Sequence, residues 1–420
     1  MKTLNLFSGC GGCSLGLKQA GINVDLAVDM DEDACNTYSA NLGHGMVWCT
    51  DLSKIRPTEL LERAKLKRDD IALIVGGPPC QGFSSAGAKD WADPRNVLIR
   101  NFVDTVTTLK PTWFIMENVE GLLTANDGVF LIEAVTQFLN AGYWVRTKKL
   151  YMERYGIPQR RKRVFIVGNL EHCNFDFPEQ THSEQPTLFN IEQQLPLIKI
   201  LDAIDDLPPP SQTGEVSYHK APQNDYQRHI RRSDNSPITH HQIKMLNEIA
   251  QRRVAFLKQG NTMKHLPKEL QHSSFTRRSY RRVMDGTPTE SRGGAPSGLK
   301  RLIAHEPSLT ITSGSPSEFI HPIDNRPLTL RECARLQSFP DWYEFQGSTT
   351  SIATQIGNAI PPMFMEVLVR HIQTFATWHR AENSLGRWLG IDATKSSGKS
   401  PILIKVLYEL QERTNAFSYA

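Results

Sequence analysis

The residue best placed for nucleophilic chemistry is Cys80, within the segment GGPPCQGFS at residues 76–84. The apolar run at residues 71–75 precedes this segment and predicts a buried parallel strand. Open α/β sheets form their sites beyond the carboxyl ends of such strands. Two prolines restrict the backbone before Cys80, and Gly82 permits a mobile loop after it. An arbitrary cysteine is more often buried and inert, but this setting predicts a nucleophile whose thiol needs activation.

Two further groups of polar residues adjoin strand-like runs. Glu117 and Asn118 follow the apolar run at residues 113–116. A half-buried carboxyl group beside a substrate can remain protonated and act as an acid. Arg161 and Arg163 alternate in the segment before another apolar run, so both would project from one face and could bind a phosphate or a base carbonyl. The structural alternative for this basic run is a solvated strand edge.

A glycine-rich turn, SGCGG at residues 8–12, separates a strand-like run (4–7) from a helix expected at 14–20. Such a turn presents backbone amides and a helix N-terminus to a nucleotide-like ligand. Asp29 lies 20 residues after Gly9, where an acidic residue takes ribose hydroxyls in such folds. The glycine spacing matches the dinucleotide fingerprint only in part, and a tight structural turn is the alternative. The pattern does not separate a nicotinamide dinucleotide from S-adenosylmethionine.

The elements that must position these residues follow an alternating pattern. Over the first 170 residues, strand-like runs alternate with helix-like stretches, which predicts an α/β fold with helices on both faces of a mostly parallel sheet. Residues 175–210 are rich in Pro, Gln and Asp and predict a linker or extended loop. We expect an amphipathic helix at 241–258, begun near the pair His240–His241 and stopped by Gly260. Further helical patterns occupy these ranges: 330–336, 362–374 and 402–410.

The charge and composition of the chain limit which classes of molecule it is expected to bind. The 420 residues carry a net charge of +4, but residues 219–301 hold 17 Lys and Arg against 6 Asp and Glu. A basic segment in an otherwise acidic chain favours a polyanion, usually nucleic acid, although a solvated basic face is the alternative. No apolar run is long enough to span a membrane. The seven cysteines indicate free thiols in a reducing compartment, and the CGGC segment at residues 10–13 lacks the second ligand pair of a zinc site.

Taken together, these motifs resemble those of the cytosine-5 DNA methyltransferase family, in the family's order, over about residues 3–375. The matching segments are FSGCGG (7–12), PPCQ (78–81), ENV (117–119), QRRKR (159–163), RECARLQSFP (331–340) and QIGNAIPP (355–362). Any one of them alone would be weak evidence, but chance agreement of several in this order is negligible.

The resemblance implies a mechanism residue by residue. Cys80 would add to carbon 6 of a flipped cytosine, and Glu117 would hydrogen-bond and protonate nitrogen 3. Asn118 would hold the strand end, and Arg163 together with Arg161 would grip the base carbonyl. The resemblance also implies S-adenosylmethionine as cofactor and no metal.

The implied cofactor site departs from the family in two places. The family usually has Glu where Asp29 stands, and often an aromatic residue where Met30 stands. The implied cofactor-binding residues are Phe7, Ser8, Gly9, Gly11, Gly12, Asp29, Met30, Asp51, Leu52, Pro79 and Asn358.

The basic segment falls where the family carries its DNA-recognition region, so the partner expected is double-stranded DNA. A tRNA cytosine-5 methyltransferase on the same catalytic core is the alternative. The expected DNA-binding residues are Gln81, Ser84, Arg277, Arg278, Arg281, Arg282 and Arg292. The expected domains are a catalytic and cofactor-binding domain (1–189), a target-recognition domain (190–327), a return to the catalytic domain (328–380) and a C-terminal extension (381–420).

The architecture also suggests a cellular setting. It is typical of a prokaryotic, cytoplasmic, monomeric enzyme of a restriction system. A cognate restriction endonuclease would share its recognition sequence without needing to bind it.

Overall fold

The computed structural model describes most of the chain, in two compact units. The first unit comprises Met1–Gly156, Arg161–Leu195 and Ala359–Ala420, and the second comprises Ile157–Arg160 and Pro196–Asn358. No helix in the described part of the chain is both long and apolar enough to cross a membrane. The described residues are 1–43, 47–79, 97–184, 194–231, 236–273, 275, 298–381, 385–392 and 401–417.

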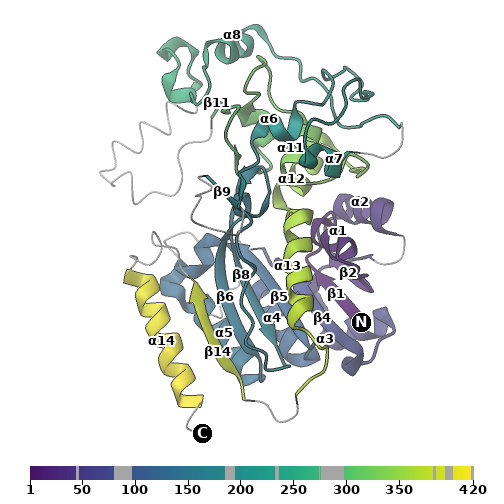
Figure 1. Cartoon of the computed structure of the whole chain (residues 1–420), viewed down its shortest axis with the longest axis vertical. Coiled ribbons are helices and arrows are strands. Elements are labelled where there is room, and N and C mark those ends of the chain that lie inside the picture. Colours follow the sequence, from purple (N-terminus) through teal and green to yellow (C-terminus); the bar gives the residue numbers. More distant parts are fainter. Residues whose placement is uncertain are drawn as a thin grey trace. The chain divides into compact units, whose positions relative to one another are not determined.

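An eight-stranded sheet in the order β14-β6-β8-β5-β4-β1-β2-β3 organises the first unit (Figure 1). All neighbours pair in parallel except β8, which runs antiparallel to both β5 and β6. The expected α/β fold with a mostly parallel sheet is therefore confirmed. The strands are β1 (Lys2–Leu6), β2 (Leu26–Asp29), β3 (Val47–Cys49), β4 (Ile71–Gly76), β5 (Trp113–Val119), β6 (Trp144–Tyr151), β8 (Lys162–Asn169) and β14 (Arg387–Asp392).

Helices cover both faces of this sheet, so side chains that point to either side of a central strand are buried. On β8, Phe165 packs against Phe364 of α13 with ring centroids 5.1 Å apart, whereas Ile166 joins the cluster that contains residues of α4 and α5. Helix α1 packs closely on α13, since a Cβ on Gly16 would lie 2.4 Å from the Pro362 carbonyl oxygen. The helices are α1 (Gly12–Gln19), α2 (Glu32–Leu42), α3 (Pro57–Ala64), α4 (Val97–Leu109), α5 (Val129–Asn140), α13 (Pro362–Phe375) and α14 (Pro401–Phe417).

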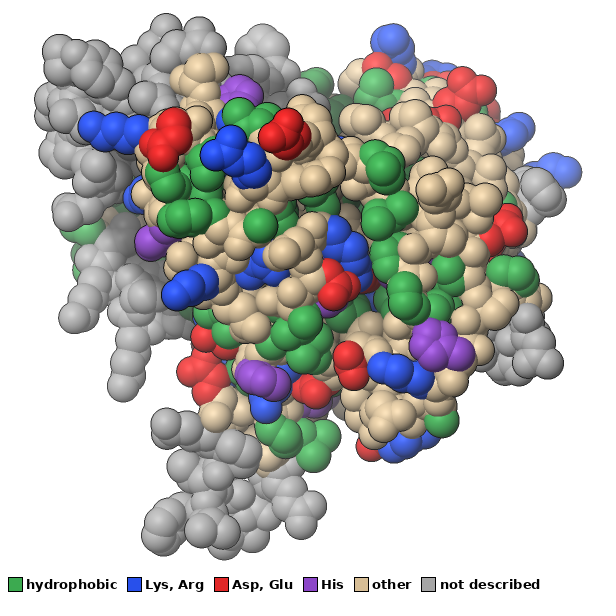
Figure 2. Space-filling model, turned by 90° about the horizontal axis from the view of Figure 1, so that it is seen from above, with side chains coloured by type: hydrophobic (Ala, Val, Ile, Leu, Met, Phe, Trp, Pro, Cys, Tyr) green, Lys and Arg blue, Asp and Glu red, His purple; other side chains and the backbone are tan. Residues whose placement is uncertain are grey.

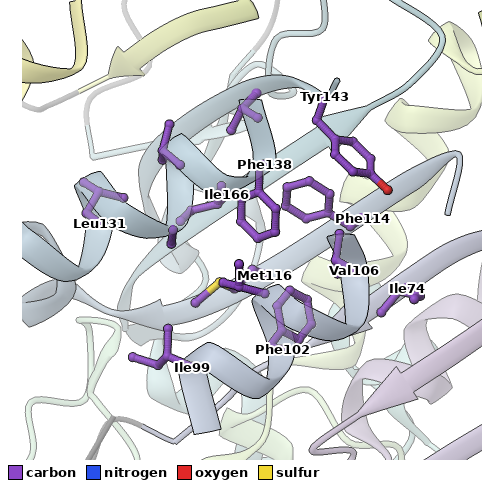
Figure 3. Close-up of a cluster of buried hydrophobic side chains, with 14 of the residues drawn as sticks. Ile74, Ile99, Phe102, Val106, Phe114, Met116, Leu131, Phe138, Tyr143 and Ile166 are labelled. Carbon is purple, nitrogen blue, oxygen red and sulfur yellow. The ribbon is translucent and has the colours of Figure 1, made fainter. Parts of the chain in front are cut away.

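The main core lies between the sheet and α4 and α5 (Figure 3). The Phe114 ring lies 4.1 Å from that of Phe138 and meets the Tyr143 ring edge-on at 5.0 Å. Gly168 makes room for this group, because a Cβ there would lie 2.2 Å from the Phe114 ring. Full burial of each such side chain contributes about 1.5–3 kcal/mol, so this core holds β4 and β5 in place beneath the motifs at their carboxyl ends.

The C-terminal tail (residues 381–420), whose position in the fold could not be predicted from the sequence, is part of the first unit. Strand β14 extends the sheet beside β6, and Leu403, Val406 and Leu410 of α14 are fully buried in the main core. Gly128 permits this approach, since a Cβ on it would lie 2.0 Å from a Val406 methyl carbon. The tail is therefore a packed addition to the catalytic fold.

The second unit is built from short helices and two-residue strands. Helix α11 covers the range expected for it, Leu330–Leu336. Further elements described in this unit are β7 (Gln159–Arg160), α6 (Ile200–Ile204), α7 (Asp225–Ile230), α8 (Glu248–Phe256), β11 (Lys300–Arg301), β12 (Ser308–Leu309), α10 (Ser315–Glu318), β13 (Phe319–Ile320) and α12 (Thr349–Asn358).

Two expectations for this part of the chain are wrong. The helix expected at 241–258 covers only Glu248–Phe256, because the Asn247 side chain caps it and the residues before it pair with the segment around Ser211. His241 starts no helix, since its buried ring bonds to the Thr329 hydroxyl and the Pro208 carbonyl.

The segment expected as a linker, 175–210, is also partly ordered. It contains the helix Ile200–Ile204, and Phe175 and Phe177 are buried. These rings belong to an aromatic cluster with Trp113, which their Pro- and Gln-rich surroundings did not reveal.

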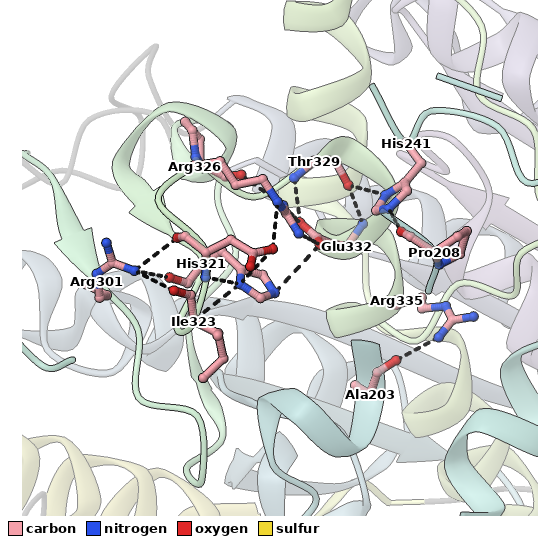
Figure 4. A network of polar contacts seen from close by, with 12 residues as sticks. Ala203, Pro208, His241, Arg301, His321, Ile323, Arg326, Thr329, Glu332 and Arg335 are labelled. Atoms are coloured by element: carbon pink, nitrogen blue, oxygen red, sulfur yellow. Dashed lines mark hydrogen bonds and ion pairs between the residues drawn. The ribbon is translucent and has the colours of Figure 1, made fainter. Parts of the chain in front are cut away.

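The second unit contains a network of buried charged and polar side chains (Figure 4). The fully buried Arg335 forms ion pairs with Asp206 and Asp341. Burial opposes the ionisation of Glu332, but hydrogen bonds and charge from Arg326 outweigh this effect and lower the pKa of that carboxyl to about 2. Removing one partner from such a network leaves an uncompensated buried charge, so loss of an acidic partner of Arg335 would destabilise this unit.

Candidate active site

The carboxyl ends of β4 and β5 bring two of the sequence motifs together. The Asn118 side-chain amide donates a hydrogen bond of 3.0 Å to the Pro78 carbonyl, and the Asn118 oxygen accepts from the Val119 amide at 2.9 Å. Asn118 is buried, so these bonds fix the backbone two residues before Cys80. Cys80 itself, together with Gln81 and Ser84, lies outside the described residues.

Glu117 is held between an arginine and the glycine segment. Arg163 Nε lies 2.8 Å from Glu117 Oε1, and the two side chains are only 16% and 11% exposed. A Cβ on Gly77 would lie 3.0 Å from Glu117 Oε2, so the absence of a side chain there lets the carboxyl group approach the strand end. The carboxyl group of Glu117 thus faces the segment that leads into Cys80.

A second guanidinium group lies near the same carboxyl group. Arg161 is 1% exposed, and its pKa is lowered to about 9 by burial and by the charge of Arg163, against an opposing effect of Glu117. Two arginines and one carboxylate form a compact charged group at the start of β8 and the end of β5. Such a group can fix the orientation of a carboxyl group and bind an electron-rich oxygen.

One contact at this strand end was not predicted. The Lys149 ammonium group, on β6, is 1% exposed and forms an ion pair with Glu120, the residue after the motif ENV. It also lies 5.3 Å from the centre of the Tyr151 ring. Nothing in the local sequence indicates this pair, because its members meet only when β6 is placed in the sheet.

The glycine turn bends sharply at the end of β1. Phe7, Gly9 and Gly11 all have positive φ values of 56°, 52° and 94°. For a non-glycine residue such as Phe7 this conformation is uncommon and typical of functional sites. The turn is secured by bonds from the Ser8 amide to Val28 O and from the Gly11 amide to Ser8 O, both 3.0 Å. It leads directly into α1 at Gly12, so amide groups converge there.

Asp29 lies beside this turn, at the end of β2. Its carboxylate accepts hydrogen bonds from the Gly9 amide at 2.7 Å and the Asp31 amide at 3.0 Å. Burial raises the pKa of Asp29, although these amide bonds oppose the change. Met30, the next residue, is 66% exposed, and an apolar side chain left in solvent at this point is available to a flat ring.

The other predicted cofactor residues lie in different settings. Hydrogen bonds from the Ser53 side chain, and then from the Ser53 amide at 2.9 Å, lower the pKa of Asp51, while Leu52 is buried. Pro79 is exposed at the end of the segment that follows β4. Asn358 is exposed and is the last residue of α12, in the second unit.

The five predicted DNA-binding arginines, Arg277, Arg278, Arg281, Arg282 and Arg292, lie outside the described residues. Part of the remaining positive charge is structural. Arg301 is buried and donates to the carbonyls of Leu257 and Val254, and Arg231 lies over the Tyr218 ring at 3.6 Å. Elsewhere, described Lys and Arg side chains stand singly among acidic and apolar ones on the face shown in Figure 2. The exposed, described cations of the basic segment are Lys220, Arg228, Lys244, Arg252, Lys258, Lys264 and Lys268.

No group of three or more His, Cys, Asp and Glu side chains among the described residues could hold a metal ion. The described groups at the site are therefore carboxylates, guanidinium groups and backbone amides, arranged along one end of the sheet.

Comparison with known proteins identifies the family of the chain. Residues 1–374 match the family model described as C-5 cytosine-specific DNA methylase. The chain is 35% identical over 389 residues to the type II methyltransferase M.DdeI of Desulfomicrobium norvegicum, covering 89% of each protein. It is 32% identical to the type II methyltransferase M1.HphI of Haemophilus parahaemolyticus, over 88% of this chain and 86% of that one.

Solved structures of methyltransferases resemble this chain in fold. A crystal structure described as that of a DNA modification methyltransferase encoded within an E. coli prophage matches with a TM-score of 0.67 and 25% identity, over 89% of this chain and 99% of that one. The S. pombe Dnmt2 methyltransferase shares the fold, with a TM-score of 0.51 and 17% identity over 89% of this chain and 97% of that one. The chain therefore belongs to the C-5 cytosine-specific DNA methylase family and is a DNA (cytosine-5) methyltransferase that uses S-adenosylmethionine.

Proposed function

We propose that this enzyme methylates carbon 5 of a flipped cytosine in duplex DNA through a covalent adduct with Cys80. The observation that carries this proposal is the meeting of three motifs at one end of the sheet. Glu117 is paired with Arg163 and faces Gly77, and Asn118 holds the Pro78 carbonyl two residues before Cys80. An acid and the backbone that carries the nucleophile are thus tied to neighbouring strands.

The chemistry requires both groups, because carbon 5 of cytosine is a poor nucleophile. The Cys80 thiolate adds to carbon 6, and Glu117 holds a proton at nitrogen 3, so the ring becomes an enamine whose carbon 5 can attack. Arg163 orients Glu117, and Arg161 with Arg163 binds the base carbonyl. Loss of the carbon 5 proton and then of Cys80 restores the aromatic ring.

S-adenosylmethionine supplies the methyl group, and the glycine turn fits it. A Cβ on Gly9 would meet nothing within 4 Å, so the turn has open space in front of it. Asp29 would take the ribose hydroxyls, and the exposed Met30 would pack on the adenine ring. Asp51 and Leu52 would contact the adenine edge. The other proposed contacts are Phe7, Ser8, Gly9, Gly11, Gly12, Pro79 and Asn358.

The region of residues 190–327 is proposed to recognise the DNA sequence. Lys and Arg contacts to phosphates would make binding salt-dependent, and one or two of the arginines at 277–292 would read base edges. The target carbon is inaccessible in a stacked duplex, so the cytosine must flip out. Gln81 and Ser84, which follow Cys80 in the sequence, would close over the flipped base.

The cellular role proposed is protection of host DNA from a cognate restriction endonuclease. The relatives named above are both type II methyltransferases. A single chain holds the catalytic motifs and the basic region, which favours a monomer that acts on DNA in the cytoplasm. The endonuclease would share the recognition sequence and need not bind this chain.

Bisulfite sequencing tests the proposal. Unmethylated plasmid DNA is incubated with the purified protein and S-adenosylmethionine, beside the Cys80→Ala variant. We expect protected cytosines at one position of one short repeated sequence, and none with the variant. Equal protection by the variant would refute the role of Cys80. If no cytosine in DNA were protected and methyl groups were transferred to tRNA instead, the substrate would be RNA.

A further inference from the structure

Two cysteines that the mechanism does not use lie beside the proposed cofactor residues. Cys35, on the first turn of α2, directs its thiol to the Asp29 carbonyl, with Sγ 3.6 Å from the oxygen. Cys49 is the last residue of β3, and its Sγ lies 3.9 Å from the Met30 carbonyl oxygen. Because Cys49 pairs with Asp29 in the register of β2 and β3, the two thiols reach consecutive carbonyls of one segment.

The two thiols lie close enough for a hydrogen-bonding interaction, and they differ in access to solvent. Cys35 is 4% exposed, whereas Cys49 is exposed, and both are free. Burial, and then the contact with the Cys49 thiol, raises the pKa of Cys35. A small disulfide in solution can therefore react first with the exposed Cys49. The buried Cys35 is the thiol that can then complete the exchange.

We propose that Cys35 and Cys49 form a redox-sensitive thiol pair whose oxidation by a small disulfide, such as oxidised glutathione, weakens cofactor binding. Cys49 attacks the glutathione disulfide, forming a mixed disulfide and releasing one glutathione. Cys35 then attacks the Cys49 sulfur, so the Cys35–Cys49 bond forms and a second glutathione leaves. The two glutathione thiolates take up the two protons that the protein thiols lose.

The disulfide acts at the cofactor site through the backbone. Neither sulfur can donate a hydrogen bond after oxidation, so both thiol contacts to the carbonyls of Asp29 and Met30 are lost. Asp29 O keeps a bond of 2.7 Å from the Thr50 amide, while the contact from Cys49 to Met30 O ends. The cross-link also ties α2 to the strand end that precedes Asp51. This consequence rests on the proposed cofactor site, but formation of the bond does not.

The test uses the full chain, oxidised glutathione and S-adenosylhomocysteine. After oxidation and alkylation of remaining thiols, peptide mapping should show a Cys35–Cys49 cross-link, removed by dithiothreitol. Calorimetry should show binding of S-adenosylhomocysteine weakened about tenfold or more by oxidation and restored by reduction. Cys49→Ser should bind equally before and after oxidation, whereas Cys173→Ser, at a cysteine distant in sequence, should respond like the wild type.

The outcomes separate this inference from the proposed function. Mixed disulfides at Cys35 or Cys49 without a cross-link would overturn the thiol pair, and so would a cross-link that leaves the affinity unchanged. Failure of the reduced protein to bind S-adenosylhomocysteine would instead refute the proposed cofactor site, while the peptide map would still decide whether the two thiols join.

Discussion

Replacing Arg163 by methionine removes the charge that holds Glu117 and keeps the apolar stem of the side chain. In the wild type, Arg163 Nε lies 2.8 Å from Glu117 Oε1 in a site where both side chains are mostly shielded from water. The variant leaves Glu117 with a weaker orienting charge at the moment when it must hold a proton at nitrogen 3. We expect a lower kcat for methyl transfer.

The magnitude follows from the type of bond lost. A hydrogen bond to a charged group contributes about 1.5–3 kcal/mol net, which corresponds to a loss in kcat of about 10- to 150-fold. Arg161 interacts with the same carboxylate and is itself buried. Loss of Arg163 removes a neighbouring like charge from Arg161, so Arg161 compensates in part, and the lower half of this range is expected.

The assay is transfer of a labelled methyl group to duplex DNA under saturating S-adenosylmethionine. Lys162→Met is the matched control, because Lys162 is exposed and points to the opposite side of the strand from Arg163. It should keep kcat within about twofold, and both variants should bind S-adenosylhomocysteine as the wild type does. If Arg163→Met kept wild-type kcat, the assignment of Arg163 as the group that orients Glu117 would be refuted.

Two stability predictions follow from other parts of the structure. Leu410→Ala should lower the free energy of unfolding of the first unit by about 2–5 kcal/mol, because Leu410 is fully buried. The control Ile404→Ala, on the exposed side of α14, should change this free energy by less than about 0.5 kcal/mol. Equal urea midpoints for the two variants would contradict the packing of α14. Burial and the charge of Arg331 lower the pKa of His240 to about 4, so the native state binds fewer protons than the unfolded state, and stability should fall by about 3 kcal/mol as the pH drops from about 6.5 to 4. His240→Asn, which suits the positive φ of 59° there, should remove most of this pH dependence in urea titrations, and an unchanged slope would contradict it.

Prediction from the sequence was most successful for strands and helices that depend on residues close together in the chain. The apolar runs at 71–75 and 113–116 became the central strands β4 and β5, because a strand buried on both faces must be apolar throughout. The helix expected at 330–336 has those bounds, since the Thr329 cap and Glu332 lie within a few residues of each other.

What the sequence did not reveal depends on contacts between distant segments. Strand β14 pairs with β6, more than 200 residues earlier in the chain, and the pairing is supported by an ion pair of Arg146 with Asp392. The same holds for the pair of Lys149 with Glu120 and for the partners of His241. A local pattern carries no information about such partners, because tertiary packing decides them.

The proposed mechanism depends above all on a covalent bond between Cys80 and cytosine. A duplex with 5-fluorocytosine at the position mapped by bisulfite sequencing tests it, because fluorine replaces the proton that must leave before Cys80 can be released. We expect a denaturation-resistant protein–DNA adduct that forms only with S-adenosylmethionine and that peptide mapping assigns to Cys80. Methylation of ordinary cytosine without any trapped adduct, or an adduct on another residue, would contradict it.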